Sequence, residues 1–145
     1  MKSKIVIIGS GFSSLSAASY LAKAGCDVSV YEKNSTLGGR ARIKKKQGFT
    51  FDMGPSWYWM PDVFDNYFQD FGKKVSDFYD LKRLSPSYRV FWDDKPDDIP
   101  SDMNELKAYF EKYEEGSGQK LEKFLAEAKI KYDVGMNEFV TKPSL

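Results

Sequence analysis

Two glycines and one acidic residue near the N-terminus have the spacing of a dinucleotide-binding site. Gly9 and Gly11 directly follow an apolar run, and Glu32 comes directly after the next apolar run along the chain. Gly9 allows a sharp turn, and Gly11 has no Cβ, so a pyrophosphate can approach the backbone closely. A carboxylate at Glu32 can accept hydrogen bonds from the hydroxyls of an adenosine ribose. Its charge would repel the 2′-phosphate of NADP, so the residues favour a dinucleotide without that phosphate.

The elements that must position these residues form a βαβ unit of about 30 residues. The apolar run 5–8 predicts a buried strand, the following segment has helical spacing that ends at Gly25, and 28–31 predicts a second strand. Amides at the helix N-terminus point at the phosphates, and the helix dipole favours their charge. Ser14 replaces the third glycine of the fingerprint, where helix and strand pack closely and a small residue is needed. This context favours a dinucleotide site over an ordinary glycine turn.

A second pair of glycines follows the acid. Gly38 and Gly39 come a few residues after Glu32 and are followed by Arg40. Adjacent glycines can form a further backbone cradle, and Arg40 is placed either to reach a phosphate or to pair with Glu32. An ordinary Gly-Gly turn is the alternative, but the short distance from Glu32 along the chain favours a role at the same ligand.

The next segment predicts a hairpin over 42–52 with solvated lysines, which are only weakly indicative of a patch for anionic lipid. Gly54 and Pro55 would then hold an extended backbone against a flat ligand, with Ser56 and the aromatic run 57–59 following. After residue 60 the pattern predicts a helix that Pro61 begins, a strand over 87–92, an acidic turn over 93–100, a helix capped by Ser101 or Asp102, and a last helix through 121–132. The aromatic stripes of these helices favour core packing over a ligand-binding surface.

Composition excludes several classes of site. With 22 basic and 21 acidic residues, the net charge of +1 offers no electrostatic case for nucleic acid. The chain has no histidine and one cysteine, so neither a histidine-based triad nor a disulfide can form within it, and we expect no metal site. No apolar run approaches the ~20 residues of a membrane-spanning helix, and the start does not fit a signal peptide. We therefore expect a cytoplasmic protein, peripheral on the inner face of the membrane.

Four segments together resemble the N-terminus of bacterial phytoene desaturases, the carotenoid desaturases of the FAD-dependent amine oxidase-like superfamily. They are Val6 to Phe12, Glu32-Lys33, Leu37 to Ala41, and Gly48 to Pro55. The resemblance implies an FAD cofactor, with the pyrophosphate at the first glycines, the ribose at the acid, and the isoalloxazine beside the Gly-Pro segment. The cofactor-binding residues that it implies by position are Gly9, Gly11, Phe12, Ser13, Ser14, Glu32, Lys33, Gly38, Gly39, Arg40, Gly54, Pro55 and Ser56. The family usually has glycine where this chain has Ser13 and Ser14.

The fold class expected from both lines of reasoning is α/β. The resemblance implies that residues 1–60 form the N-terminal part of a Rossmann-like FAD-binding domain and that residues 61–145 begin a mixed α+β substrate domain. The fold is expected to be incomplete, because a doubly wound sheet needs several more parallel strands than the two predicted here. We therefore expect an N-terminal fragment of a longer enzyme that is inactive by itself.

The function that the resemblance implies is FAD-dependent desaturation of a linear isoprenoid, phytoene or a relative, in carotenoid biosynthesis. Trp57 and Trp59 are candidates for contacting this lipophilic substrate, which would be drawn from a membrane surface. No catalytic residue can be named, and the electron acceptor, quinone or oxygen, stays open. The alternatives are a carotenoid isomerase, a saturase or an amine oxidase, all flavoenzymes, or a non-catalytic dinucleotide-binding module.

Overall fold

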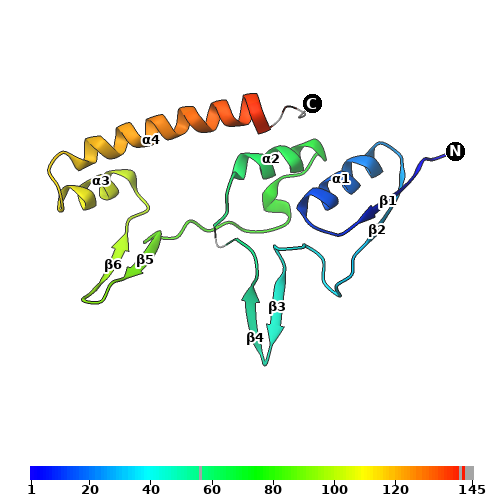
Figure 1. Cartoon of the computed structure of the whole chain (residues 1–145), viewed down its shortest axis with the longest axis horizontal. Coiled ribbons are helices and arrows are strands. Elements are labelled where there is room, and N and C mark those ends of the chain that lie inside the picture. The colour runs from blue at the N-terminus through cyan, green and yellow to red at the C-terminus, as the bar shows by residue number, and fades with distance from the viewer. Residues whose placement is uncertain (56, 141, 143–145) are drawn as a thin grey trace. The chain divides into compact units, whose positions relative to one another are not determined.

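The structure is a computed structural model that describes residues 1–55, 57–140 and 142. The chain divides into two compact units, Met1–Val75 and Ser76–Leu145. The first unit contains a βαβ unit, a hairpin and a further helix, and the second contains a hairpin, a short helix and a long helix (Figure 1). The architecture is mixed α/β, as the sequence predicts.

The predicted βαβ unit is confirmed. Strand β1 (Lys4–Ile8) leads into helix α1 (Phe12–Lys23), and strand β2 (Asp27–Tyr31) returns parallel to β1, in a register that pairs Ile5 with Val28 and Ile7 with Val30. Gly25 adopts a φ of +91°, a left-handed conformation that glycine reaches without strain, and it ends the helix as expected. Because the two strands are parallel, their carboxyl ends lie side by side, and α1 begins directly after the carboxyl end of β1.

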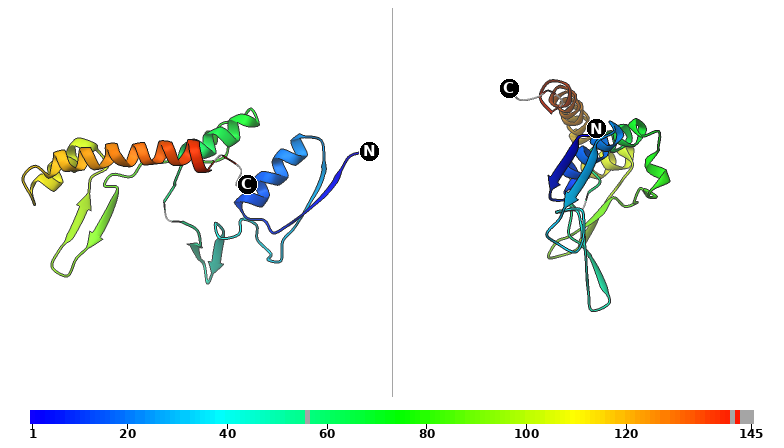
Figure 2. Two further views of the ribbon diagram at one scale, coloured as in Figure 1. Left: turned by 45° about the horizontal axis from the view of Figure 1, so that its top comes forward. Right: turned by 90° about the vertical axis from the view of Figure 1, so that its right-hand side faces the viewer.

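The lysine-rich segment forms the predicted hairpin, from β3 (Ile43–Lys46) and β4 (Phe49–Asp52), which Figure 2 shows as a two-stranded ribbon. Gln47 and Gly48 connect the strands with φ values of +51° and +81°. Two consecutive positive φ angles are typical of the tight turn whose twist matches that of antiparallel strands. The lysines of this hairpin are exposed to solvent, as the sequence predicts.

Helix α2 (Pro61–Asp70) packs against α1 within the first unit. The rings of Phe12 and Phe64 meet edge to face with centroids 5.9 Å apart, and the hydroxyl of Tyr20 donates a hydrogen bond of 2.6 Å to Asp70 Oδ2. Pro61 is in the first turn of the helix, where an N–H group would have no intrahelical acceptor, so proline loses no hydrogen bond there. The short 3-10 helix η1 (Val75–Asp77) follows. Although α2 shares a compact unit with the nucleotide-type βαβ unit, the assignment of residues 61–145 to a substrate domain stays a prediction.

The second unit corrects one sequence-based expectation. Strand β5 (Tyr88–Phe91) forms where a strand was predicted, but residues 96–99 of the expected acidic turn form its antiparallel partner β6 (Pro96–Ile99). Arg89 and Asp98 are directly paired and form two hydrogen bonds, of 2.5 and 2.8 Å. Cross-strand contacts of this kind override the low strand propensity of proline and aspartate, and Pro96 stands at the first strand position, where it is tolerated.

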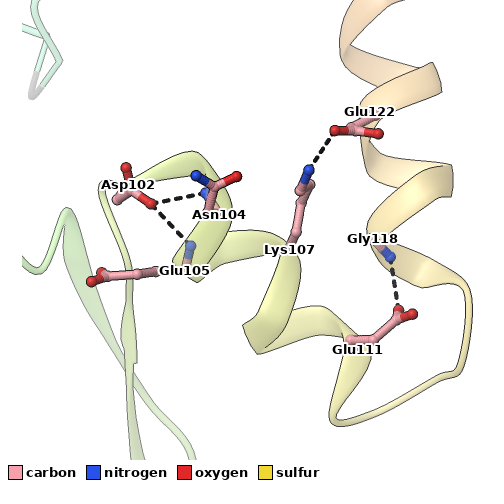
Figure 3. Close-up of polar contacts among 7 residues, drawn as sticks. All are labelled: Asp102, Asn104, Glu105, Lys107, Glu111, Gly118 and Glu122. Carbon is pink, nitrogen blue, oxygen red and sulfur yellow. Dashed lines mark hydrogen bonds and ion pairs between the residues drawn. The ribbon is translucent and has the colours of Figure 1, made fainter.

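Helices α3 (Met103–Glu111) and α4 (Ser117–Val134) form a helical hairpin, and the π-helical segment η2 (Gly135–Val140) continues α4. Glu111 closes the connection, because its carboxylate accepts hydrogen bonds of 2.9 Å from the amides of Gly116 and Gly118; Figure 3 shows the bond from Gly118. These amides, led by that of Gly118, lower the pKa of Glu111 below its usual value. A carboxylate at a helix N-terminus also meets the favourable end of the helix dipole.

The N-terminus of α3 offers a first test of this local structure. Asp102 Oδ1 accepts hydrogen bonds of 2.9 and 3.1 Å from the amides of Asn104 and Glu105, which confirms Asp102 as the cap (Figure 3). Asp102→Ala should lower the free energy of unfolding of the second unit by about 0.5–2 kcal/mol. Asp102→Asn should retain most of the stability, because asparagine caps equally well. Urea unfolding followed by circular dichroism measures both, and equal losses in the two variants would contradict a capping role.

Much apolar surface is left exposed. Among the described residues, Val75 is the only hydrophobic side chain that is buried, whereas Val6 and Ile8 of the parallel sheet are 64% and 87% exposed. Strands of a parallel sheet are ordinarily covered on both faces. These side chains are therefore available to pack against further polypeptide. None of the helices in the described part of the chain is long and apolar enough to cross a membrane.

Candidate dinucleotide-binding site

The turn between β1 and α1 is open on the side where a phosphate would approach. Gly9 has a φ of +92°, and its amide donates a hydrogen bond of 2.7 Å to the carbonyl of Tyr31. A Cβ atom added at Gly9 or at Gly11 would meet no atom within 4 Å. Gly11 is the N-cap of α1 and provides no side-chain cap for its first amides. The turn therefore presents backbone N–H groups beside open space, which is the arrangement that an anion needs.

The acid expected at the ribose position is held in place by hydrogen bonds. Glu32 Oε2 accepts one of 2.9 Å from the amide of Ser10 and one of 2.7 Å from its hydroxyl. Glu32 Oε1 accepts one of 2.9 Å from the amide of Asn34 and one of 2.6 Å from its side-chain Nδ2. The carboxylate thus lies directly beside the glycine turn, as a shared role at one dinucleotide requires.

Neither Ser10 nor Asn34 was predicted as a partner of this carboxylate. Ser10 occupies the unspecified position between the two glycines, and it is 1% exposed. Asn34 stands two positions after the acid. A hydroxyl residue inside the turn, and an asparagine close enough to form a local turn with its own neighbours, were signals that could have identified them.

These donors keep the carboxylate ionised. They lower the pKa of Glu32 to about 2, with the Ser10 hydroxyl as the largest cause and the amide and side chain of Asn34 next. A hydrogen bond to the charged form of an acid favours that form. At neutral pH Glu32 is therefore a negatively charged hydrogen-bond acceptor. Its charge attracts donors such as ribose hydroxyls and disfavours a 2′-phosphate.

The lowered pKa makes a prediction about stability. The folded-state pKa of about 2 lies below the ordinary 4.5, so these hydrogen bonds contribute fully at pH values above about 4.5 and are lost as the pH falls through about 2. Unfolding midpoints of the wild-type protein and Glu32→Gln should therefore differ by a constant amount near neutral pH and converge below pH 4.5. A difference that persists unchanged down to pH 2 would show that the charge of Glu32 contributes nothing.

The Gly-Gly segment lies against the same turn. The amide of Gly38 donates a hydrogen bond of 2.9 Å to the carbonyl of Ser10. Gly39 has a φ of +62°, and a Cβ atom there would lie 3.0 Å from Gly11 Cα. The structure therefore brings the two glycine segments into contact. Arg40 is exposed, and the ion pairs formed by the described residues do not include one with Glu32.

Gly54 of the Gly-Pro segment lies against the end of the segment that contains Gly38 and Gly39. The amide of Met53 donates a hydrogen bond of 2.9 Å to the carbonyl of Arg42, and a Cβ atom at Gly54 would lie 3.0 Å from Ala41 Cα. Gly54 thus packs against the end of the segment that contacts the glycine turn. Pro55 is exposed, whereas Ser56 lies outside the described residues. The remaining predicted cofactor residues are exposed at Phe12, Ser13 and Lys33 and half-buried at Ser14.

The aromatic residues proposed for the substrate lie on the surface of the first unit. Trp57 and Trp59 are 53% and 70% exposed. Between them, Tyr58 stacks on Phe64 with ring centroids 5.0 Å apart, and Phe64 contacts Phe12 in the first turn of α1. Two ring contacts therefore connect this aromatic run to the glycine turn. Within the described residues, no group of three or more histidine, cysteine or acidic side chains is placed to hold a metal ion.

The family and the relatives that match this chain agree with the resemblance to carotenoid desaturases. Residues 7–79 match the family described as NAD(P)-binding Rossmann-like domain. The chain is 50% identical over 137 residues to the carotenoid 3,4-desaturase of Haloarcula japonica, covering 94% of this chain and 28% of that protein. It is 39% identical over 140 residues to the 4,4′-diapophytoene desaturase (4,4′-diaponeurosporene-forming) of Staphylococcus aureus strain Newman, covering 96% of this chain and 28% of that protein. The chain thus spans about 28% of the length of these relatives, and the resemblance to carotenoid desaturases is confirmed.

Proposed function

Because the chain belongs to the NAD(P)-binding Rossmann-like domain family, we propose that it forms the FAD-binding part of an oxidoreductase that desaturates a linear isoprenoid in carotenoid biosynthesis. The single observation that carries the cofactor proposal is the ionised Glu32, fixed by hydrogen bonds beside a glycine turn that is open to a phosphate. The desaturase names of both relatives support the reaction and the lipophilic substrate class.

The residues fit the parts of a dinucleotide. The turn from Gly9 to Ser14, with Phe12 and Ser13 inside it, would hold the pyrophosphate at the first amides of α1, because no protein atom lies within 4 Å of a Cβ atom added at Gly9 or Gly11. Glu32 and the adjacent Lys33 would hold the adenosine ribose. Gly38, Gly39 and Arg40 would contact the cofactor from the neighbouring segment, and Gly54, Pro55 and Ser56 would lie beside the isoalloxazine.

The chemistry belongs to the flavin, which when bound can accept a hydride from a saturated carbon of the substrate. The share of this chain is to bind and orient the cofactor and to exclude the NADP-type phosphate through the charge of Glu32. We assign no catalytic residue. The electron acceptor, quinone or oxygen, is left open in the proposal. A flavin-dependent isomerase, saturase or amine oxidase is the alternative within the same cofactor class.

The cofactor proposal is tested on the protein encoded by the complete gene, purified without added nucleotide. We expect a bound flavin with its characteristic visible spectrum, released as FAD on denaturation, and desaturation of phytoene or a related polyene precursor. The 145-residue chain by itself is expected to be inactive, because its exposed apolar faces lack their packing partners. Purified protein that contains no flavin and gains none from added FAD would leave the non-catalytic module as the better reading.

We further propose that the protein works on the cytoplasmic surface of a membrane, where its substrate is dissolved. Trp57 and Trp59 are exposed, and tryptophan suits an interface because its ring is apolar and its N–H is polar. Trp57→Ala and Trp59→Ala should reduce turnover of liposome-borne substrate more than turnover of detergent-dispersed substrate. Trp92→Ala, an exposed tryptophan of the second unit, is the control. Unchanged turnover on liposomes in both variants would contradict a role in substrate entry.

A further inference from the structure

The carboxylate of Glu32 has no hydrogen-bonding capacity left over. A carboxylate offers about four lone-pair sites, two on each oxygen. Ser10 donates twice to Oε2, and Asn34 donates twice to Oε1. A ribose hydroxyl that donates to Glu32 with good geometry must therefore take the place of a donor that is already there.

Ser10 and Asn34 differ in how readily each can break its hydrogen bond to Glu32. Ser10 is 1% exposed, its amide also donates to Oε2, and its carbonyl accepts the hydrogen bond from Gly38. If its hydroxyl turned away from Glu32, a buried donor would lose its partner, which is costly. Asn34 is exposed, so its side-chain amide can exchange Glu32 for water at little cost. The Asn34 backbone amide can keep its own bond to Oε1 while the side chain moves.

We infer that Ser10 is a positioning residue that holds Glu32 in its ligand-accepting orientation, and that the Asn34 side chain is a placeholder that a ribose hydroxyl displaces from Oε1. This inference rests on the proposed dinucleotide site. It adds two residues whose removal has opposite effects on the contact between Glu32 and the ribose. Removing the Ser10 hydroxyl loosens the carboxylate and weakens its contact with the ribose. Removing the Asn34 amide abolishes a competitor and leaves that contact intact or stronger.

The test compares the affinities of ADP and 2′-deoxy-ADP, measured by titration calorimetry on the complete gene product after removal of bound nucleotide. The ratio of the two dissociation constants reports the ribose contact and is insensitive to a general loss of folding. We expect the wild-type protein to prefer ADP. Ser10→Ala should reduce this preference several-fold, on the order of tenfold. Asn34→Ala should keep or increase it.

Matched controls are Ser29→Ala in β2 and Asn66→Ala in α2, both exposed, which should leave the preference unchanged. A Ser10→Ala protein with the full wild-type preference for ADP would overturn the positioning role while leaving the dinucleotide site standing. An Asn34→Ala protein that loses the preference would overturn the placeholder role. A wild-type protein that does not bind ADP, or that binds both nucleotides equally, would overturn the ribose site itself and this inference with it.

Discussion

Gly11→Ala is expected to weaken FAD binding strongly while leaving the fold intact. The backbone at Gly11 has a φ of −73°, which alanine adopts without strain, and an added Cβ atom meets no protein atom within 4 Å. The folded state should therefore lose less than about 1 kcal/mol, the difference between glycine and alanine at a helix N-cap. The space around this position is where we place the pyrophosphate. A methyl group there acts as overpacking against the ligand and should weaken binding by about 5- to 150-fold.

The comparison with two other glycines makes this result specific. Gly39→Ala should destabilise the protein as well as impair binding, because the new Cβ atom would lie 3.0 Å from Gly11 Cα and the φ is +62°. Gly135→Ala is the control for FAD binding, which it should leave unchanged; stability should stay the same or rise slightly, since Gly135 has a helical φ of −56° and open space around it. Thermal unfolding and FAD titration separate the three cases. A Gly11→Ala protein that retains FAD as tightly as the wild type would exclude a pyrophosphate at this turn.

Glu32→Ala is expected to weaken FAD binding on the order of ten- to a hundredfold, the range for a hydrogen bond to a charged group. The carboxylate is ionised at neutral pH because its pKa is held at about 2, so it carries its full charge when a ribose hydroxyl takes the place of the Asn34 side chain. Truncation also leaves the buried Ser10 hydroxyl without its acceptor, which adds a loss of stability to the loss of binding. Flavin content after purification and titration of the apoprotein with FAD measure the effect.

The isosteric variant distinguishes the charge from the shape of this side chain. Glu32→Gln keeps an acceptor for Ser10 but removes the charge, so it should bind FAD more weakly than the wild type and reject the 2′-phosphate of NADP less strongly. Glu127→Ala, an exposed acid on α4, is the control and should retain full flavin content. Undiminished flavin in Glu32→Ala would contradict the assignment of this residue to the ribose.

The sequence alone was sufficient to predict the βαβ unit, the hairpin over 42–52, the helix that begins at Pro61, and a helix capped by Ser101 or Asp102, of which the structure selects Asp102. Each depends on neighbours a few positions apart along the chain: an apolar run, a pair of turn residues, a proline or a cap. The glycine turn and the acid after β2 belong to the same class, because a strand–helix–strand unit of fixed length brings its first turn and its last residue together.

Only the tertiary structure revealed which residues complete the site and where local propensity is overridden. Ser10 and Asn34 as the partners of Glu32, and Gly39 against Gly11, are contacts between segments whose separation in sequence carries no periodic signal. The strand over 96–99 pairs with β5 along its whole length, with Arg89 and Asp98 in contact across the two strands, although its own residues favour a turn. Spacing along the chain therefore predicts where the candidate dinucleotide site lies, whereas the orientation of Glu32 depends on donors that the fold brings to it.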